Sequence, residues 1–203
     1  DLVLTFSDLQ ADIAADLLRQ GVAVLGYNQR DIAGILAMIR SLGALTDVPQ
    51  QADALATTYE NRLAGIAAAA SGKPRPVVYF EEWDEPMISG IRWVSELIEI
   101  AGGRDAFADR ALEPAAKDRI IDPAQVIAAK PDVILASWCG KKVRPERIAS
   151  RPGWQQIPAV QNGNIIEIKS PLILQPGPAA LTDGLDAVLA AIETAREGMR
   201  KQC

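Results

Sequence analysis

Aromatic side chains stand where predicted β-strands end, and these are the residues whose type and spacing suggest chemistry. Aromatic residues make up only 5% of the 203 residues, yet four follow or close apolar strand-like runs, namely Phe6, Tyr27, Trp83 and Trp138. Open parallel sheets bind ligands at the carboxyl ends of their strands, and aromatic rings offer a large, rigid contact surface. The pattern predicts a cleft for a small molecule, with these rings in its wall; the alternative is that they close the sheet ends as core.

Charged residues accompany the rings at two of these strand ends. The acidic run of residues 81–85 contains Glu81, Glu82, Asp84 and Glu85. Carboxylates this close on one loop cannot flank a substrate from both sides for acid–base catalysis, so we favour a solvated loop, with hydrogen bonds to ligand amides as the alternative. Lys141 and Lys142 follow another strand and are expected either to pair with an anionic ligand or to lie on the wet surface.

Composition removes several classes of function. There is no histidine, which excludes a His-ligated zinc site and a Ser-His-Asp or Cys-His nucleophile. The two cysteines, Cys139 and Cys203, are too few for a Cys-only zinc site; they form one bridge, or Cys139 is a buried thiol, or neither has functional weight. With 21 basic and 26 acidic residues and no phosphate-binding glycine motif, neither nucleic acid nor a nucleotide is expected as a partner. No catalytic apparatus is visible and no enzyme is predicted, although a small-molecule α/β enzyme remains the alternative from another class.

Apolar periodicity predicts an α/β chain. Residues at helical spacing alternate with short apolar runs, which favours parallel sheets covered by helices. The predicted strands are residues 1–6, 22–25, 77–80, 133–136 and 164–168. The predicted helices are residues 8–19, 31–43, 46–71, 89–101, a short one from 122, and 179–200.

The helix over residues 46–71 divides the chain. About 23 residues at roughly 1.5 Å each make a rod of about 35 Å, which we interpret as a spacer between two lobes rather than a surface helix of one domain. We therefore expect an N-terminal lobe over residues 1–45, a connecting helix over 46–72 and a C-terminal lobe over 73–203. Residues 131–135 echo residues 1–4, which suggests two related lobes, the first without its opening units. The chain opens directly on an apolar strand, so we expect a mature, processed or truncated form.

The whole chain resembles the cobalamin-type periplasmic substrate-binding proteins of ABC importers, in the superfamily that also contains siderophore and haem receptors. The order and spacing of several short motifs carry the resemblance. They are residues 1–6, 20–22, 31–32, 78–83, 89–90, 99–103, 122–126, 130–135, 151–154 and 174–179.

The resemblance implies a fold and a function. The fold is two Rossmann-like lobes, each a three-layer α/β/α sandwich with a mainly parallel sheet, joined by one long helix. The function is capture of a corrinoid between the lobes and its delivery to an ABC permease with a separate ATPase, in the periplasm. A ferric siderophore or haem receptor is the alternative in the same class, while zinc and manganese receptors of related fold depend on histidines, which this chain lacks.

The resemblance, taken with the strand-end positions, also implies site residues. The residues expected to bind ligand are Phe6, Asp8, Tyr27, Glu82, Trp83, Trp138, Cys139 and Leu172. Asp12 matches the first-lobe acid that docks on the permease, whereas Leu174 stands at the second-lobe position, where Asp183 could substitute. No cofactor or metal is expected, and the membrane is expected to be reached only through the permease or a lipid anchor outside this chain.

Overall fold

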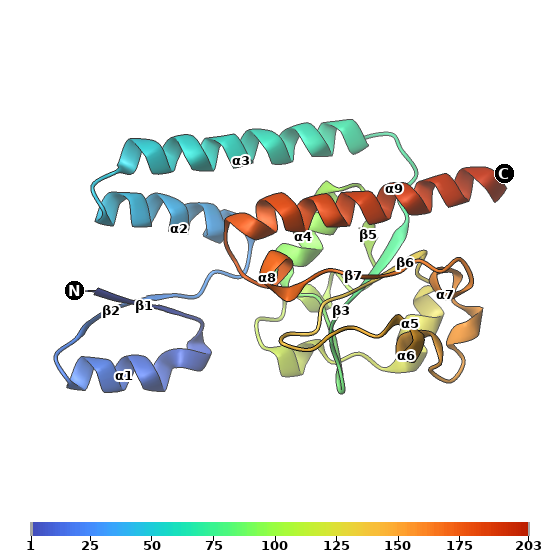
Figure 1. Ribbon diagram of the computed structural model, residues 1–203, viewed down its shortest axis with the longest axis horizontal. Coiled ribbons are helices and arrows are strands. Elements are labelled where there is room, and N and C mark those ends of the chain that lie inside the picture. The colour runs from blue at the N-terminus through green and yellow to red at the C-terminus, as the bar shows by residue number, and fades with distance from the viewer. Residues whose placement is uncertain (1, 203) are drawn as a thin grey trace.

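The computed structural model describes residues 2–202 and contains two separate sheets (Figure 1). The smaller sheet pairs β1 (Leu2–Phe6) with β2 (Ala23–Tyr27) in parallel, in a register that runs from Leu2 opposite Ala23 to Phe6 opposite Tyr27. The connection between the strands is a 3₁₀ turn (Asp8–Gln10) and α1 (Ala11–Arg19). None of the described residues of β1, α1 or β2 is buried. We call this part the N-terminal unit.

The larger sheet has the order β4-β3-β6-β7, with β5 also paired to β3. Its strands β3, β5, β6 and β7 are parallel, whereas β4 runs antiparallel to β3. The bounds are β3 Val77–Asp84, β4 Met87–Ser89, β5 Arg104–Asp105, β6 Val133–Ala136 and β7 Ile165–Glu167. All four residues of β6 are buried, because helices cover both of its faces.

Two hydrophobic clusters divide the central strands by alternation. Val78, Phe80, Val133 and Leu135 face the cluster that contains α4 (Arg92–Ile100) and α9 (Leu185–Gln202). Tyr79, Ile134 and Ala136 face the other cluster, with side chains from the helices on that side. Those helices are α5 (Pro123–Ala129), α6 (Pro145–Ala149) and α7 (Pro158–Gln161). The period of two along a strand thus makes the three-layer α/β/α sandwich that the sequence predicts.

The long predicted helix is α3 (Pro49–Ala70), 22 residues that span about 33 Å. It runs antiparallel beside α2 (Ile32–Leu45) and on towards the larger sheet (Figure 1). The two helices approach closely at Gly43, where an added Cβ would lie 2.1 Å from the Cβ of Ala52. Most buried residues of α2 and α3 belong to the same cluster as α4 and α9, and α3 contacts α4, so these helices pack on the helical layer that covers the larger sheet. None of the described helices is long and apolar enough to cross a membrane.

The remaining elements form turns and short helices around the larger sheet. Before α9 lie α8 (Ser170–Ile173) and a π-helical turn (Ala180–Gly184). Three 3₁₀ turns complete the described chain, Arg110–Leu112, Ala116–Arg119 and Trp154–Gln156. Trp93 and Trp154, the two other tryptophans, are buried and pack in the two hydrophobic clusters.

Some sequence expectations were wrong in detail. The strand predicted to end at Phe80 continues to Asp84, and Glu81 is fully buried, so the acidic run is not a solvated loop. The predicted helix over residues 89–101 begins only at Arg92, because Ser89 lies in β4, which turns back onto β3. Cys139 is exposed, so the buried thiol is wrong as well. A bridge to Cys203 involves a residue outside the described part of the chain.

Candidate functional site

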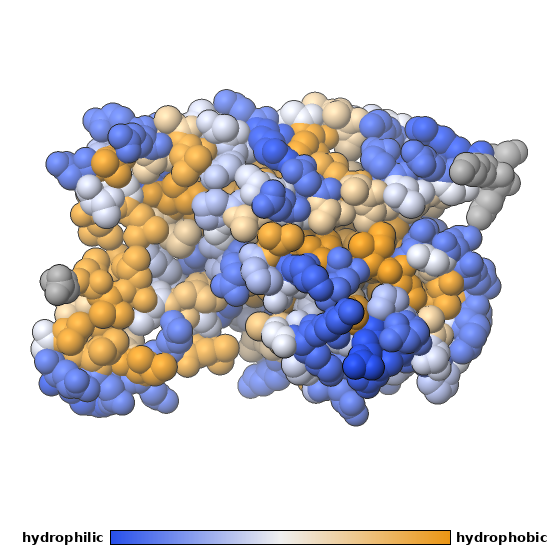
Figure 2. All heavy atoms as spheres, in the orientation of Figure 1, coloured by the Kyte–Doolittle hydropathy of each residue, from blue (hydrophilic) through white to orange (hydrophobic). Residues whose placement is uncertain are grey.

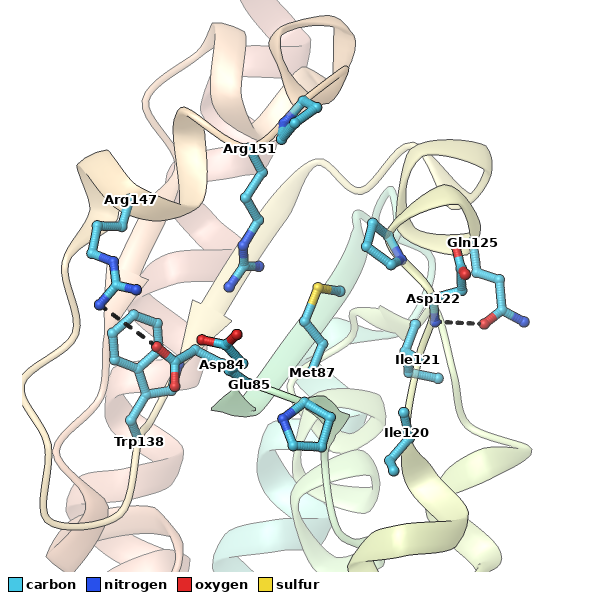
Figure 3. A pocket seen from close by; sticks show the side chains of 13 residues that line it. Asp84, Glu85, Met87, Ile120, Ile121, Asp122, Gln125, Trp138, Arg147 and Arg151 are labelled. Carbon is cyan, nitrogen blue, oxygen red and sulfur yellow. Dashed lines mark hydrogen bonds and ion pairs between the residues drawn. The ribbon is translucent and has the colours of Figure 1, made fainter.

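The carboxyl ends of β3, β6 and β7 lie along one edge of the larger sheet, because these strands are parallel. A pocket of about 800 Å³ opens at this edge, a size suited to a small molecule. Figure 3 shows it between a charged wall, with Asp84, Arg147 and Arg151, and an apolar wall, with Ile120 and Ile121. The rest of the lining is Glu85, Pro86, Met87, Asp122, Pro123, Gln125, Trp138 and Pro152.

Three carboxylates at the end of β3 each bind a cation from a different loop. Glu81 accepts hydrogen bonds of 2.5 and 3.0 Å from Arg151. Glu82 accepts bonds of 2.7 and 3.0 Å from Arg119. Asp84 accepts two from the Lys141 ammonium, at 2.8 and 2.7 Å. The three ion pairs fasten three loops to one strand end and so hold this edge in a defined shape.

A β-bulge gives the carboxylates their separate directions. The pairing register of β3 with β4 shifts between Glu81 and Trp83. A bulge breaks strict alternation and increases local twist. Glu81 consequently turns toward the buried network, while Glu82 reaches Arg119 and Asp84 reaches the loop after β6.

Glu81 is the centre of a buried hydrogen-bond network. Besides Arg151, it accepts bonds from the Tyr79 hydroxyl at 3.2 Å and from Trp138 Nε1 at 3.1 Å. Burial and the neighbouring carboxylate raise the pKa of Tyr79, so this hydroxyl stays protonated and donates. Burial by itself would lower the pKa of Arg151, but the hydrogen bonds to Glu81 outweigh it and raise that pKa. Tyr79 is therefore neutral and Arg151 charged, and the network fixes the Trp138 ring.

The two predicted tryptophans of this edge differ in exposure. Trp138 is 2% exposed and forms a wall shared by the main pocket and a smaller one of about 250 Å³. Trp83 is half-buried, and its Nε1 donates to the carbonyl of Glu85 at 3.0 Å. The Lys141 ammonium lies 5.3 Å from the Trp83 ring centre and 5.1 Å from that of Trp138. The Trp83 ring is therefore more exposed than the Trp138 ring, although only Trp138 lines the two pockets.

The smaller pocket is more basic than the main one. Its lining includes Lys141, Lys142 and Lys169, together with Glu167. The hydrogen bond from Lys169, followed by the backbone bond from Val143, outweighs burial and lowers the pKa of Glu167, so this acid is ionised and pairs with Lys169. Leu172 does not line this pocket; it packs against the core that contains α9.

The predicted residues of the N-terminal unit lie at the carboxyl ends of β1 and β2. Phe6 and Tyr27 line a pocket of about 350 Å³ that also includes Pro176 from the larger part of the molecule. The guanidinium of Arg30 lies 5.8 Å from the Phe6 ring centre and pairs with Asp8 at 2.7 Å. The Tyr27 hydroxyl is 2.6 Å from that of Ser41. Figure 2 shows a hollow between this unit and the larger part.

Seven of the eight predicted ligand residues lie at one of the two sheet edges, and the eighth, Leu172, does not. Phe6, Asp8 and Tyr27 lie on the N-terminal unit, while Glu82, Trp83, Trp138 and the exposed Cys139 lie on the larger sheet. Asp12 is exposed in the first turn of α1, and its docking role stays a prediction. Among the described residues, no group of three histidine, cysteine, aspartate or glutamate side chains could hold a metal ion.

Sequence reasoning missed the arginines. Arg119, Arg147 and Arg151 all contribute to the edge, and none was expected there. One signal was available: an acidic run that continues an apolar strand and ends before Met87 requires buried counter-charges. Their identity was not readable, since the partners lie 37 to 70 residues further along the chain.

Comparisons with known proteins agree with this architecture. A family model described as "Periplasmic binding protein" matches residues 1–172. A comparison with curated proteins returns no significant match. Many solved structures are similar, and three of them are described here. A possible iron-binding (periplasmic solute-binding) protein from Staphylococcus epidermidis is 20% identical over 95% of this chain and 76% of its own, with a TM-score of 0.77. The periplasmic haem-binding protein RhuT from Roseiflexus sp. is 24% identical over 94% and 76%, with a TM-score of 0.74. The vitamin B12 binding protein BtuF of Vibrio cholerae is 22% identical over 97% and 75%, with a TM-score of 0.68.

Proposed function

This chain belongs to the periplasmic binding protein family, and we propose that it is the solute receptor of an ABC importer. In this proposal it captures a cobalamin-like corrinoid between the N-terminal unit and the larger sheet and delivers it to a permease driven by a separate ATPase. In this proposal the lobes keep the boundaries predicted from the sequence, residues 1–45 and 73–203 around the connecting helix 46–72. The site of action is the periplasm, and the receptor performs no chemistry on its ligand.

One observation carries this proposal. Each of the two sheets ends in an edge of parallel strand ends, Figure 2 shows a hollow between the N-terminal unit and the larger part, and the larger edge is held by three ion pairs. A wall that is fixed before binding, as the larger edge is, loses little conformational entropy when the ligand enters. Such a cleft suits capture and release of a solute. Asp12 on α1 is the proposed permease contact, exposed on the outer helix of the N-terminal unit.

The ligand class follows from the surfaces at the two edges. Phe6 and Trp83 are half-buried rings on opposite edges, and both carry a cation over one face. The main pocket adds an apolar wall of isoleucines and prolines. A large flat macrocycle with apolar faces and neutral amide side chains fits rings and apolar walls. Proteins of similar fold described as binding vitamin B12 or haem support a ligand of this size.

An anionic iron chelate, a ferric siderophore or haem, is the second candidate. The observation that favours it is the basic smaller pocket, where Lys142 and Lys169 stand beside Lys141. Acidic groups of a chelate could contact these ammonium groups. Because Lys141 and Lys169 already pair with Asp84 and Glu167, this candidate ranks second.

The test is calorimetric titration of the protein with cobinamide, cobalamin, haem and a ferric hydroxamate. We expect submicromolar binding of a corrinoid, with the dissociation constant raised about tenfold by Trp83→Ala, because loss of a stacking ring costs about 1–2 kcal/mol. Tyr59→Ala, which truncates a half-buried ring on α3 away from both edges, is the matched control and should bind as the wild type does.

Two results would overturn parts of the proposal. Tight binding of only haem or the hydroxamate would keep the receptor and replace the ligand. Absence of binding to all four compounds by a folded protein would sink the corrinoid proposal and its second candidate together.

A further inference from the structure

We propose that the carboxylates at the end of β3, Glu81, Glu82 and Asp84, make the main pocket select an electroneutral ligand over an anionic one. This inference rests on the proposed function, and it adds the charge class of the ligand and the residues that set it. The carboxylates act through the cations they hold, and of the three only Asp84 also lines the pocket.

The cations nearest the pocket are already neutralised. Arg151 lines the pocket, yet two of its nitrogens bind the fully buried Glu81. Lys141 lines the smaller pocket, which shares the Trp138 wall with the main one, and gives its ammonium to both oxygens of Asp84; the Asp84 side chain is 4% exposed and that of Lys141 41%. A ligand carboxylate would have to compete for these cations with Glu81 and Asp84, two buried carboxylates that cannot turn to water instead.

Arg119 is the third cation whose charge is compensated by a carboxylate of β3. Its side chain is 2% exposed, and both terminal nitrogens bind Glu82 while one also donates to the carbonyl of Ser89. Without Glu82 its charge would stand buried beside the strand end. The pair therefore removes positive charge from the edge, and the Arg119 donor that has no partner, Nε, is buried.

The charged groups that remain add no net positive charge. The positive charge of Arg147 is only weakly compensated, since its closest approach to the Asp84 carboxylate is 3.9 Å. Glu85 and Asp122 line the same pocket and are acidic. Arg147, Glu85 and Asp122 together carry a net charge of −1, and the three ion pairs described above add no net charge.

This arrangement disfavours anions. An anion that enters loses hydration, which is costly unless a charged partner compensates it. It finds Arg147 alone, with two unpaired acids nearby. A ligand bearing neutral amides loses less hydration and can hydrogen-bond to the same polar groups. Specificity arises here from a penalty on the wrong ligand as well as from contacts with the right one.

The experiment compares two corrins that share a macrocycle. Dicyanocobinamide carries neutral amides at its periphery, and dicyanocobyrinic acid carries carboxylates. We expect wild-type protein to bind the amide form more tightly. Asp84→Asn should release the Lys141 ammonium and shift the ratio of the two affinities about fivefold toward the acid, by an amount that falls as salt is added.

Two further variants change the charge of the Asp84–Lys141 pair in the opposite direction and then restore its neutrality. Lys141→Gln should shift the ratio away from the acid, and the double variant Asp84→Asn with Lys141→Gln should return it close to the wild-type ratio. Glu146→Gln is the matched control: it removes one acid from the exposed first turn of α6, outside the pocket lining, and should leave the ratio unchanged.

A second measurement needs no ligand. In a Cys203→Ser background, exposed Cys139 lies two residues from Lys141 and reports its free charge. Asp84→Asn should accelerate its reaction with dianionic 5,5′-dithiobis(2-nitrobenzoate) about fivefold relative to neutral 4,4′-dithiodipyridine. Glu146→Gln should change this ratio less.

The outcomes separate this inference from the proposed function. Wild-type preference for the acidic corrin, or an unchanged affinity ratio in Asp84→Asn, would overturn the inference while the receptor stands. Failure of both corrins, haem and the hydroxamate to bind would overturn the proposed function, and the thiol reaction would then decide the charge argument: an unchanged reagent ratio in Asp84→Asn refutes it.

Discussion

The N-terminal unit and the larger sheet are built from the same strand-helix-strand pattern, but only the larger one has a buried core. None of the described residues of β1, α1 or β2 is buried, and Leu2 and Leu4 of β1 are 45% and 49% exposed. All four residues of β6 are buried between two helical layers. A sheet covered on one face by one helix cannot exclude water from its strands. The difference teaches that the alternating pattern specifies the path of the chain, while the number of covering layers decides its rigidity.

This contrast bears on the proposed site. The edge of the larger sheet is held by a core below it and by three ion pairs around it. The edge of the N-terminal unit has an exposed pair, Asp8 with Arg30, and few contacts to the rest. We therefore expect the larger edge to be preformed and the smaller edge to adjust when a ligand binds.

The largest expected effect separates the two sheets by their cores. Leu135→Ala removes a fully buried side chain of β6 and should lower the free energy of unfolding by about 2–5 kcal/mol, because a cavity remains in a packed layer. Leu4→Ala makes the same change on an exposed strand and should cost less than about 1 kcal/mol. Urea denaturation followed by circular dichroism measures both. Equal losses in the two variants would contradict the contrast.

The next effect separates the ion pairs of the two edges. Glu82→Ala strands the buried guanidinium of Arg119 and should destabilise the protein by about 3 kcal/mol. Asp8→Ala breaks a pair whose acid is 68% exposed and should cost about 0–1 kcal/mol. The same denaturation experiment measures both, and raising the salt concentration should reduce only the smaller loss. A loss from Glu82→Ala below that from Asp8→Ala would refute the distinction between the edges.

The sequence predicted the helices and the layered class better than the site. α3 was found because its period and its proline at the first turn are local signals. The start of the helix predicted from residue 31 is confirmed for the same reason: Asp31 is a capping residue, and its side chain accepts a bond from the backbone of Gly34 ahead of α2. Layering followed from the strand-helix alternation.

The predicted end of β3, at Phe80, was wrong because distant residues decide whether an acidic side chain can be buried. Glu81, Glu82 and Asp84 are polar enough to predict a loop, and the bulged strand persists because cations from three later loops neutralise them. Exposure in the N-terminal unit was likewise unreadable, since Leu2 and Leu4 look like core residues in any strand pattern. Pairing and covering depend on tertiary placement, which periodicity does not encode.

The smallest effect concerns the attachment of the N-terminal unit. Gln29 follows β2, and its Nε2 donates to the carbonyl of Pro176 at 3.1 Å, a hydrogen bond between this unit and the larger part. Gln29→Ala removes a bond worth about 1 kcal/mol. Opening of the unit should then become easier, so backbone amides of β1 and β2 should exchange with deuterium about fivefold faster. Amides of β6, held in the buried core, should exchange at the wild-type rate.

Gln51→Ala is the matched control for this measurement, because Gln51 is an exposed glutamine on α3. It should leave exchange in β1 and β2 unchanged. Exchange mass spectrometry of peptides covering β2 and β6 reads both regions in one experiment. Faster exchange in β6 as well would mean that Gln29 supports the whole fold, and unchanged exchange in β2 would mean that the backbone bond from Trp93 to the Arg30 carbonyl, at 3.0 Å, is enough to hold the unit in place. Either result would remove the physical basis for an edge that adjusts beside one that is fixed.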